Sequence, residues 1–422
     1  MDHDLIKKVE ILADAAKYDV SCSSSGVNRP NKAGGVGNAA AWGICHTYTA
    51  DGRCVSLLKT LLSNYCRYDC AYCVNRRSND VPRATFTSRE LAELTIEFYR
   101  RNYIEGLFLS SGVLRNPDYT MEQMVEVLKE LRTVHRFNGY IHLKTIPGAS
   151  PELVRQAGLH ADRLSVNIEI PTENNLKMLA PEKDHQSVYR PMHQIREGIA
   201  ENREDRRKFR KTPRFAPAGQ STQIIVGASS ERDREILRLS SHLYDRSELK
   251  RVYYSGFVPV NVYDQRLPRI KAAPLVRENR LYQADWLMRF YEFRAEEIAG
   301  DQFPDLDLEM DPKLAWAIRH PEWFPVDVNR DDYHRILRVP GIGVRSAKLI
   351  VMSRRRGRLK AEHLAKIGVV MKRAVFFLTC GETGPAATIN ELGPAQVRNL
   401  VTTKKKGRVD PRQLWLPFSD PL

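Results

Sequence analysis

The stretch VSLLKTLLSNYCRYDCAYCVNR, residues 55–76, decides the fold of this chain. It opens with an apolar run, residues 55–63, which is typical of a buried strand. Three thiols then follow at the spacing CxxxCxxC, on Cys66, Cys70 and Cys73. A loop with this spacing can fold three thiolates around one face of an iron–sulfur cube. Because a [4Fe–4S] cluster normally takes four protein ligands, one iron would stay open. The sequence therefore predicts such a cluster on the loop after this strand.

A zinc site is the alternative interpretation of the three cysteines. Structural zinc takes four ligands, and Cys54 or His46 could supply the fourth. Six of the seven cysteines lie between residues 22 and 73, and a reducing cytoplasm argues against disulfides. The upstream Cys22, Cys45 and Cys54 could therefore hold a second cluster or a zinc ion with His46, or they could be small buried hydrophobic residues.

Strands and helices alternate after the cysteine loop. Further apolar runs predict strands at residues 106–111, 140–146, 163–170, 221–227 and 251–260. Helical patterns occupy residues 88–102, 151–158, 185–202 and 231–246, and Thr120 is expected to cap one more helix. This βα alternation predicts an α/β fold with a parallel sheet, either a partial barrel or a doubly wound sheet. In both cases the chemistry is expected at the carboxyl ends of the strands.

Composition and charge restrict the class of protein. The 422 residues are 42% hydrophobic and 28% charged, as in an ordinary globular protein. No run of eighteen apolar residues exists, so we expect no membrane span and a cytoplasmic location. The net charge of +15 indicates a polyanionic partner, although a merely basic surface would give the same number.

The pattern of motifs divides the chain into five parts. They are an N-terminal helix with a Ser/Gly-rich, cysteine-containing loop at 1–50, an α/β core at 51–300, an acidic, proline-containing linker at 301–330, a compact helical segment at 331–385 and a basic tail at 386–422.

The helical segment contains RILRVPGIGVRSAKLIVMSRRRGR, residues 335–358, which has the form helix, VPGIG, helix. Gly341 and Gly343 permit a tight turn, and the second helix starts there with exposed amides. Such a helix start binds a phosphate without reading any base. The expected binding residues are Gly341, Gly343, Arg345, Lys348, Arg354 and Arg355. A helical hairpin that docks a protein is the alternative.

A second basic run, RRKFRKTPR, covers residues 206–214. Phe209 and Phe215 are interleaved with its cations, a pattern typical of a loop that binds single strands. A solvated helix end followed by a loop explains the same residues equally well.

The cysteine loop and the strands around it resemble the radical S-adenosylmethionine (SAM) superfamily over residues 52–295. The resemblance implies a [4Fe–4S] cluster that binds SAM, release of a 5′-deoxyadenosyl radical, and an electron donor such as flavodoxin or ferredoxin. It also implies that Tyr72 lies beside the adenine and that polar strand ends hold the rest of SAM. Those strand ends carry Ser111, Gly112, Asn167 and Glu169, and Gln223 on the fifth strand would lie near the adenine. Lys144 would pair with the SAM carboxylate or with Glu169.

The VPGIG segment is similar to the helix–hairpin–helix module of DNA repair proteins. Together the two modules resemble a family of DNA modification or repair radical SAM proteins. The resemblance implies a partial (β/α)6 barrel, of the TIM-like radical SAM type, followed by an all-α helix–hairpin–helix domain, and hydrogen abstraction from a nucleotide in single-stranded or flipped-out form. Three alternatives stay open: an RNA- or tRNA-modifying radical SAM enzyme, a non-catalytic Fe–S DNA-binding protein, and a metabolic radical enzyme with a protein-docking tail.

Overall fold

The computed structural model describes residues 3–18, 44–48, 54–380 and 388–402. The chain forms two compact units. The first comprises the described residues of 3–231 and 242–274, and the second comprises those of 232–241 and 275–402. Among the described residues, no helix is both long enough and apolar enough to cross a membrane.

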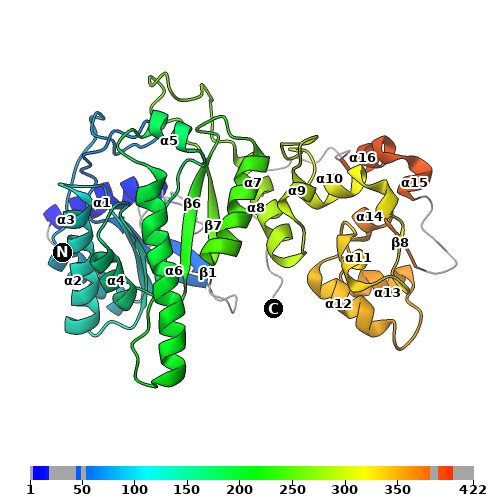
Figure 1. Ribbon diagram of the computed structural model, residues 1–422, viewed down its shortest axis with the longest axis horizontal. Helices are drawn as coiled ribbons and strands as arrows, with labels where there is room; N and C mark the ends of the chain where they lie inside the picture. The colour runs from blue at the N-terminus through cyan, green and yellow to red at the C-terminus, as the bar shows by residue number, and fades with distance from the viewer. Residues whose placement is uncertain (1–2, 19–43, 49–53, 381–387, 403–422) are drawn as a thin grey trace, which may run out of the picture. The chain divides into compact units, whose positions relative to one another are not determined.

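The first unit is built on a seven-stranded sheet whose strands follow one another in chain order (Figure 1). Strands β2 to β7 are parallel, and β1 pairs with β2 in the antiparallel direction. The strands are β1 (Ile44–Tyr48), β2 (Cys54–Leu61), β3 (Gly106–Ser110), β4 (Tyr140–Lys144), β5 (Arg163–Ser165), β6 (Gln220–Val226) and β7 (Arg251–Gly256). The six parallel strands confirm the predicted partial (β/α)6 barrel. Strand β1 lies inside the segment that was predicted to be a loop.

Apolar side chains explain why the sheet is buried. Strand β3 is buried along its whole length, and Leu107, Ile141 and Leu164 on three successive strands are completely inaccessible to solvent. Such uninterrupted apolar strands are typical of parallel sheets covered by helices. The helices are α1 (His3–Ala15), η1 (Ala16–Tyr18), α2 (Ser88–Arg100), α3 (Pro117–Lys129), η2 (Glu130–Val134), α4 (Pro151–His160), α5 (Glu173–Leu179), α6 (His185–Lys208) and α7 (Asp233–Ser247).

Helix α3 begins earlier than the sequence predicted. Asn116, not Thr120, is its N-cap, and the Asn116 side chain accepts a hydrogen bond from the Tyr119 amide at 2.7 Å. Pro117 occupies the first helical position, where its missing N–H costs nothing. Thr120 instead lies inside the helix, and its hydroxyl donates to the Asn116 carbonyl.

The fourth predicted strand, residues 163–170, is much shorter in the structure. Regular pairing ends at Ser165, because the chain turns sharply at Glu169, whose φ is +64°. A single parallel bridge between Glu169 and Ile224 continues the sheet beyond that point. The shortened strand therefore ends in an irregular, hydrogen-bonded edge.

The second unit is mostly helical. Its helices are α8 (Leu275–Phe290), α9 (Ala295–Ile298), α10 (Pro312–Arg319), η3 (Pro321–Trp323), α11 (Tyr333–Arg338), α12 (Val344–Ser353), α13 (Ala361–Lys366), α14 (Met371–Ala374), α15 (Ile389–Leu392) and α16 (Pro394–Thr402). The short strands β8 (Val326–Asp327) and β9 (Leu378–Thr379) pair in parallel.

The predicted linker, residues 301–330, is wrong in part. Its middle is helix α10, in which residues 312–317 are buried and Trp316 is 1% exposed. Asp311 caps this helix, and Pro312 is its first residue. The acidic and proline-containing composition that suggested a linker is therefore a helix start. Helices α15 and α16 likewise lie within the predicted basic tail.

Candidate active site

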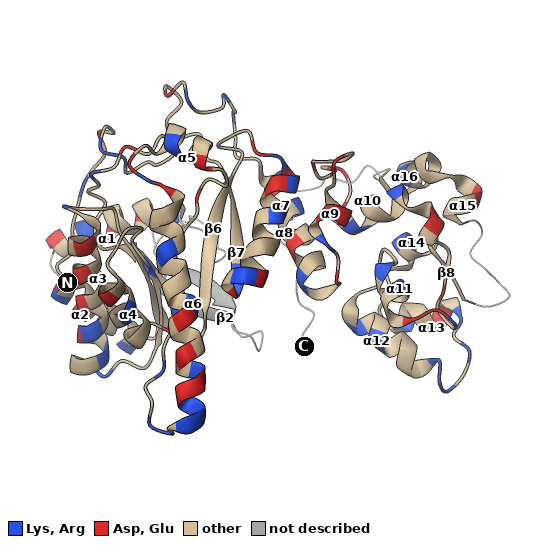
Figure 2. Cartoon of the chain, in the orientation of Figure 1, with Lys and Arg blue, Asp and Glu red and all other residues tan. Residues whose placement is uncertain are grey.

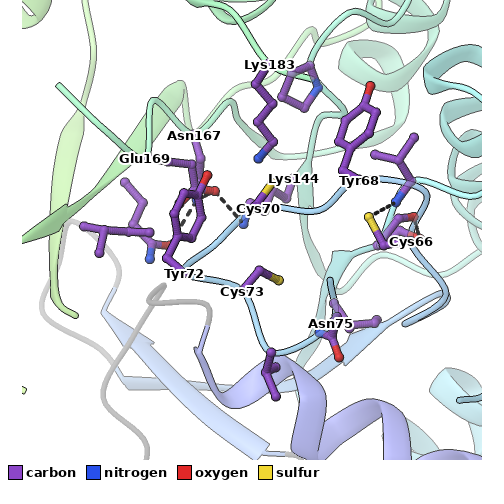
Figure 3. Close-up of a pocket in the computed structure, with 18 of the residues that line it drawn as sticks. Cys66, Tyr68, Cys70, Tyr72, Cys73, Asn75, Lys144, Asn167, Glu169 and Lys183 are labelled. Atoms are coloured by element: carbon purple, nitrogen blue, oxygen red, sulfur yellow. Dashed lines mark hydrogen bonds and ion pairs between the residues drawn. The ribbon is translucent and has the colours of Figure 1, made fainter. Parts of the chain in front are cut away.

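The three cysteines of the loop between β2 and α2 line one pocket at the carboxyl edge of the sheet (Figure 3). Side chains from β4, from the segment after β5 and from β6 line the same pocket, among them Lys144, Asn167, Glu169 and Gln223. The structure thus brings together residues that are separated by more than 150 positions in the sequence. Ser111, Gly112 and Tyr72 also line it, so all the predicted cluster and SAM residues meet in one place.

Hydrogen bonds to the backbone fix the path of the cysteine loop. The Arg83 guanidinium donates to the carbonyls of Asn75 at 2.8 Å and Asn79 at 2.9 Å. The Asn261 side-chain amide donates to the carbonyls of Ala71 at 2.7 Å and Cys73 at 2.9 Å. These donors satisfy loop carbonyls that no regular element could pair. The thiols are therefore carried on a loop with a defined shape.

A buried ion pair adds a further restraint. Arg76 donates to Asp264 at 2.6 Å, and their side chains are only 6% and 8% exposed. Hydrogen bonds from Arg266 and Arg76 hold the pKa of Asp264 well below its ordinary value, despite the burial of this carboxyl.

Replacing Arg76 with Ala should leave Arg266 as the remaining cation beside the Asp264 carboxylate among the described residues. We expect a loss of about 2 kcal/mol in the free energy of unfolding, because the buried carboxylate loses a hydrogen bond from a charged donor. Urea unfolding monitored by circular dichroism measures this. The double variant Arg76→Met/Asp264→Leu is the control, since it removes both charges. The double variant should recover most of the lost free energy of unfolding. If the Arg76→Ala variant is as stable as the parent, the ion pair does not stabilise the loop.

Gly112 allows the loop after β3 to approach the cysteine loop. A Cβ at this position would lie 2.4 Å from the Tyr65 carbonyl oxygen. The next amide, of Val113, donates to the Cys66 Sγ at 3.4 Å. Beside them, the Ser111 hydroxyl donates to the Gly112 carbonyl at 2.7 Å. The glycine is therefore needed for backbone contact behind Cys66, in addition to lining the pocket.

The three thiols differ in exposure: Cys70 is buried, and Cys66 and Cys73 are half-buried. Burial raises the pKa of the Cys70 thiol and raises that of Cys73 to about 12. Thiolates in this pocket therefore require a strong positive partner such as iron. In the described parts of the chain, no three His, Cys, Asp or Glu side chains converge tightly enough to hold a single metal ion. An iron–sulfur cube makes a different demand, because each thiolate binds its own iron.

Opposite the cysteines lies a polar wall. The Asn167 amide donates to Glu169 and to Gln223, both at 3.2 Å. Lys144 lies 3.7 Å from the Glu169 carboxylate. Lys144 ends β4, Asn167 and Glu169 follow β5, and Gln223 lies in the middle of β6. Of the two sequence interpretations of Lys144, its pairing with Glu169 is the one present here.

Glu169 has an unusual backbone conformation. Its φ of +64° lies in the left-handed region, which costs a residue with a side chain free energy. Two hydrogen bonds to β6 impose it: the Glu169 amide donates to the Gln223 carbonyl at 2.9 Å, and its carbonyl accepts from the Ile225 amide at 2.7 Å. Strain maintained in this way is typical of functional sites, and here it presents the carboxylate to the pocket.

Two polar groups in the pocket lack partners of their own. The Tyr72 hydroxyl is buried and has no hydrogen-bond partner in the part of the chain that the structure describes. Lys183 lies with its ammonium 5.9 Å from the centre of the Tyr72 ring and forms no ion pair with a carboxylate of the described residues. Burial lowers the pKa of Lys183, but electrostatic interaction with Cys70, Tyr72 and Glu169 outweighs burial and raises this pKa well above the ordinary value. A buried hydroxyl beside a half-buried ammonium fits a polar, anionic ligand between them.

The sequence did not identify Lys183 as a site residue. It lies in the turn between α5 and α6, outside the strand ends from which the other site residues were predicted.

The structure does not test the upstream cysteines as metal ligands. Cys22 lies outside the described residues, and Cys45 and Cys54 pair with Leu57 and Tyr48, three positions apart in the β1–β2 ladder. The second metal site stays a prediction.

The predicted phosphate-binding turn lies in the second unit, between α11 and α12. Gly341 has a φ of +87°, and a Cβ there would lie 2.6 Å from the Val370 carbonyl oxygen. Gly343 is the N-cap residue of α12. Lys313, from α10, supports the turn by donating to the Ile342 carbonyl at 2.6 Å. Two helices joined by a tight glycine turn are therefore present.

Of the cations predicted around this turn, Arg345, Lys348 and Arg355 are exposed and form no ion pair with the described residues. Arg354 differs, because its guanidinium donates to the carbonyls of Val328 and Asp331 and holds the loop before α11. The prediction that Arg354 contacts a phosphate is therefore corrected to a structural role. The sequence concealed this because four arginines stand within five residues.

Comparison with known proteins agrees with this geometry. Residues 60–200 match the Radical SAM superfamily, and this part of the chain is a radical SAM domain. Domains of this superfamily use a [4Fe–4S] cluster and SAM. No curated protein matches the sequence.

Several solved structures are similar in part. HydG, the FeFe-hydrogenase maturase from Carboxydothermus hydrogenoformans, is 12% identical with a TM-score of 0.41, over 53% of this chain and 48% of HydG. Methylornithine synthase PylB is 16% identical with a TM-score of 0.36, over 66% of each chain. The cobalamin-dependent enzyme OxsB is 11% identical with a TM-score of 0.32, over 74% of this chain and 46% of OxsB. The chain thus spans about half the length of HydG, and such distant similarity does not indicate a shared substrate.

Proposed function

We propose that this radical SAM enzyme modifies or repairs nucleic acid, with DNA as the favoured substrate. Cys66, Cys70 and Cys73 hold the [4Fe–4S] cluster in this proposal. When reduced, for instance by a flavodoxin or ferredoxin, the cluster and SAM together supply a 5′-deoxyadenosyl radical that abstracts hydrogen from the target nucleotide. The chain's own contribution is to position SAM and the nucleotide and to keep water out.

The polar wall and the two unpartnered groups divide the binding of SAM between them. In this proposal Glu169 and Asn167 hold the ribose hydroxyls, and Tyr72 lies beside the adenine. Lys183 supplies a cation for the carboxylate of the methionine part. The observation that supports this assignment is that Tyr72 and Lys183 line the cysteine pocket, and that among the described residues the hydroxyl has no hydrogen-bond partner and the ammonium no carboxylate partner.

Replacing Lys183 with Met should weaken SAM binding by roughly tenfold or more, because it removes a charge-assisted contact while keeping the apolar stem. Glu169→Gln should weaken it by a similar factor. Equilibrium dialysis of the reconstituted protein measures both affinities. Neither variant should change the iron content, because neither residue is a cluster ligand. Unaltered SAM affinity in either variant would remove that residue from the site.

The nucleic-acid partner rests on the glycine turn of the second unit. The first-turn amides of α12 have no acceptor within the helix, and Arg345 and Lys348 stand on that helix without carboxylate partners among the described residues. A backbone phosphate fits this combination of amides and cations. The module resembles a helix–hairpin–helix, and the net charge of +15 favours the same kind of partner.

The test is anaerobic incubation of the reconstituted enzyme with SAM, reductant and either DNA or RNA, followed by mass spectrometry of the nucleosides. The proposal predicts a SAM-dependent mass change in one DNA nucleoside. A change confined to RNA would move the substrate to RNA or tRNA. If neither polymer is altered, and neither binds in a salt-dependent way, a metabolic substrate and a protein-docking turn become the better account.

A further inference from the structure

A second cationic surface lies at the C-terminal end of α6, far along the chain from the glycine turn. Residues 201–214 carry a net charge of +4. Figure 2 shows Lys and Arg gathered at this helix end and on the loop that follows it. We call the segment 206–214 the α6 tip. Its cations are Arg206, Arg207, Lys208, Arg210, Lys211 and Arg214.

None of these six cations forms an ion pair or a side-chain hydrogen bond with the described residues, and all six are exposed. Three carboxylates stand close by in the sequence, on Glu201, Glu204 and Asp205, yet none of them pairs with the tip. Other exposed arginines of the first unit behave differently: Arg89, Arg100 and Arg155 each lie within 3.1 Å of a carboxylate. Unpaired like charges repel one another, so such a cluster costs stability unless an anion neutralises it.

The tip has a defined shape. The Asn202 side chain donates to the Pro213 carbonyl at 2.7 Å and accepts from the Phe215 amide at 3.1 Å, which closes the loop onto the helix. Phe215 is buried against two glycines, and a Cβ at Gly158 would lie 2.1 Å from its ring. Phe215 is therefore an anchor in the core, not a base-stacking residue as its place in the sequence suggested. Phe209 is 65% exposed and is free to stack.

The tip is distant from the catalytic pocket. Helix α6 starts two residues after Lys183, at the pocket, and its 24 residues span about 36 Å. The loop after it returns to the amino ends of the strands, where the Ala218 amide donates to the Asp162 carbonyl, just before β5. Figure 1 shows the same arrangement, with α5 at one end of α6 and the opposite end extending beyond the sheet. The tip therefore lies toward the amino ends of the parallel strands, and the pocket lies at their carboxyl ends.

We infer that the α6 tip binds the phosphate backbone of a nucleic acid, as a contact separate from the pocket and from the glycine turn. This inference rests on the nucleic-acid substrate proposed above. Four of the six cations are arginines, whose planar fork matches phosphate oxygens. Phe209 among them provides a surface on which a base can stack. An acidic electron donor would be attracted by the same positive charge. Docking at the α6 tip, however, would hold that donor far from the cysteines.

The test compares variants of the full-length, cluster-loaded protein by fluorescence anisotropy, with single-stranded and duplex DNA at two salt concentrations. The tip variant is Arg206→Gln/Arg207→Gln/Arg210→Gln/Lys211→Gln. The control, Arg89→Gln/Arg100→Gln/Arg101→Gln/Arg155→Gln, removes the same charge from exposed, ion-paired positions.

We expect the tip variant to bind roughly tenfold or more weakly than the control. Its log–log slope of affinity against salt concentration should be smaller by about three, because fewer phosphate contacts release fewer counterions. Phe209→Ala should weaken single-stranded binding by roughly fivefold or more and duplex binding much less. Thermal melting of each variant verifies that the fold is retained.

The outcomes separate this inference from the proposed function. If the tip variant binds like the control while Gly343→Asp weakens binding, the inference is wrong and the proposed function stands. If the parent does not bind either DNA, both are wrong. Co-sedimentation with phosphatidylserine vesicles provides a further check, because tip-dependent binding to vesicles but not to DNA would identify a membrane surface as the partner and overturn the inference.

Discussion

Cys66→Ser should reduce the iron content of the anaerobically reconstituted protein from about four per chain to background. Serine keeps the size of the side chain and an acceptor for the Val113 amide, which now donates to Cys66 Sγ at 3.4 Å. The variant therefore removes a thiolate ligand with little change in the loop. With only two of the three thiolate ligands left, the protein should not hold the cluster stably. Iron assay and the visible absorption of the cluster measure the loss.

Cys380→Ala is the matched control for this experiment. Cys380 is also buried, at 3% exposure, but it lies in the second unit and does not line the pocket. It should retain the full iron content. A Cys66→Ser protein that still holds about four irons would show that the cluster is bound elsewhere, and the upstream Cys22, Cys45 and Cys54 would then become the candidates.

Gly343→Asp should weaken nucleic-acid binding by roughly a hundredfold at low salt, because it places a carboxylate where the phosphate is expected and so turns an attraction into a repulsion. The substitution should not harm the fold. Asp is a favoured N-cap residue, and Gly343 is the N-cap of α12. A Cβ there would meet the Tyr291 hydroxyl at an ordinary contact distance of 3.6 Å.

Gly343→Ala separates charge from shape in the same assay. It adds the same Cβ without the carboxylate and should bind within a few-fold of the parent. Gly341 would be a poor choice, because its φ of +87° and the nearby Val370 carbonyl make any side chain disruptive. Equal binding by Gly343→Asp and Gly343→Ala would show that this turn does not contact nucleic acid. The substrate proposal would then rest on net charge and the α6 tip.

Local sequence patterns predicted much of this structure. The spacing of Cys66, Cys70 and Cys73 behind an apolar strand predicted both the pocket and its place at the carboxyl edge of the sheet. Strand ends predicted Asn167 and Glu169, because parallel strands bring their carboxyl ends to one edge. The glycines at 341 and 343 predicted a tight turn, and Gly341 provides the left-handed backbone, with φ +87°, that few other residues tolerate.

Other features depend on contacts between distant residues and leave no local pattern. Lys183 belongs to a turn between helices, and only the folded chain brings it to Tyr72. Asn261 supports the cysteine loop from 188 positions away. Arg354 and Arg355 are neighbours in one basic run, yet packing directs the first onto backbone carbonyls and leaves the second exposed. Which cation of a run is structural is decided by tertiary packing.

Reductive cleavage of SAM tests the central claim most directly. The reconstituted protein, its Cys66→Ser variant and its Cys380→Ala variant are incubated anaerobically with SAM and dithionite, without any nucleic acid, and 5′-deoxyadenosine is quantified by mass spectrometry. The account predicts 5′-deoxyadenosine from the parent and from Cys380→Ala, and none above background from Cys66→Ser. A parent protein that holds its full complement of iron and forms no 5′-deoxyadenosine, or a Cys66→Ser variant that forms as much as the parent, would contradict it.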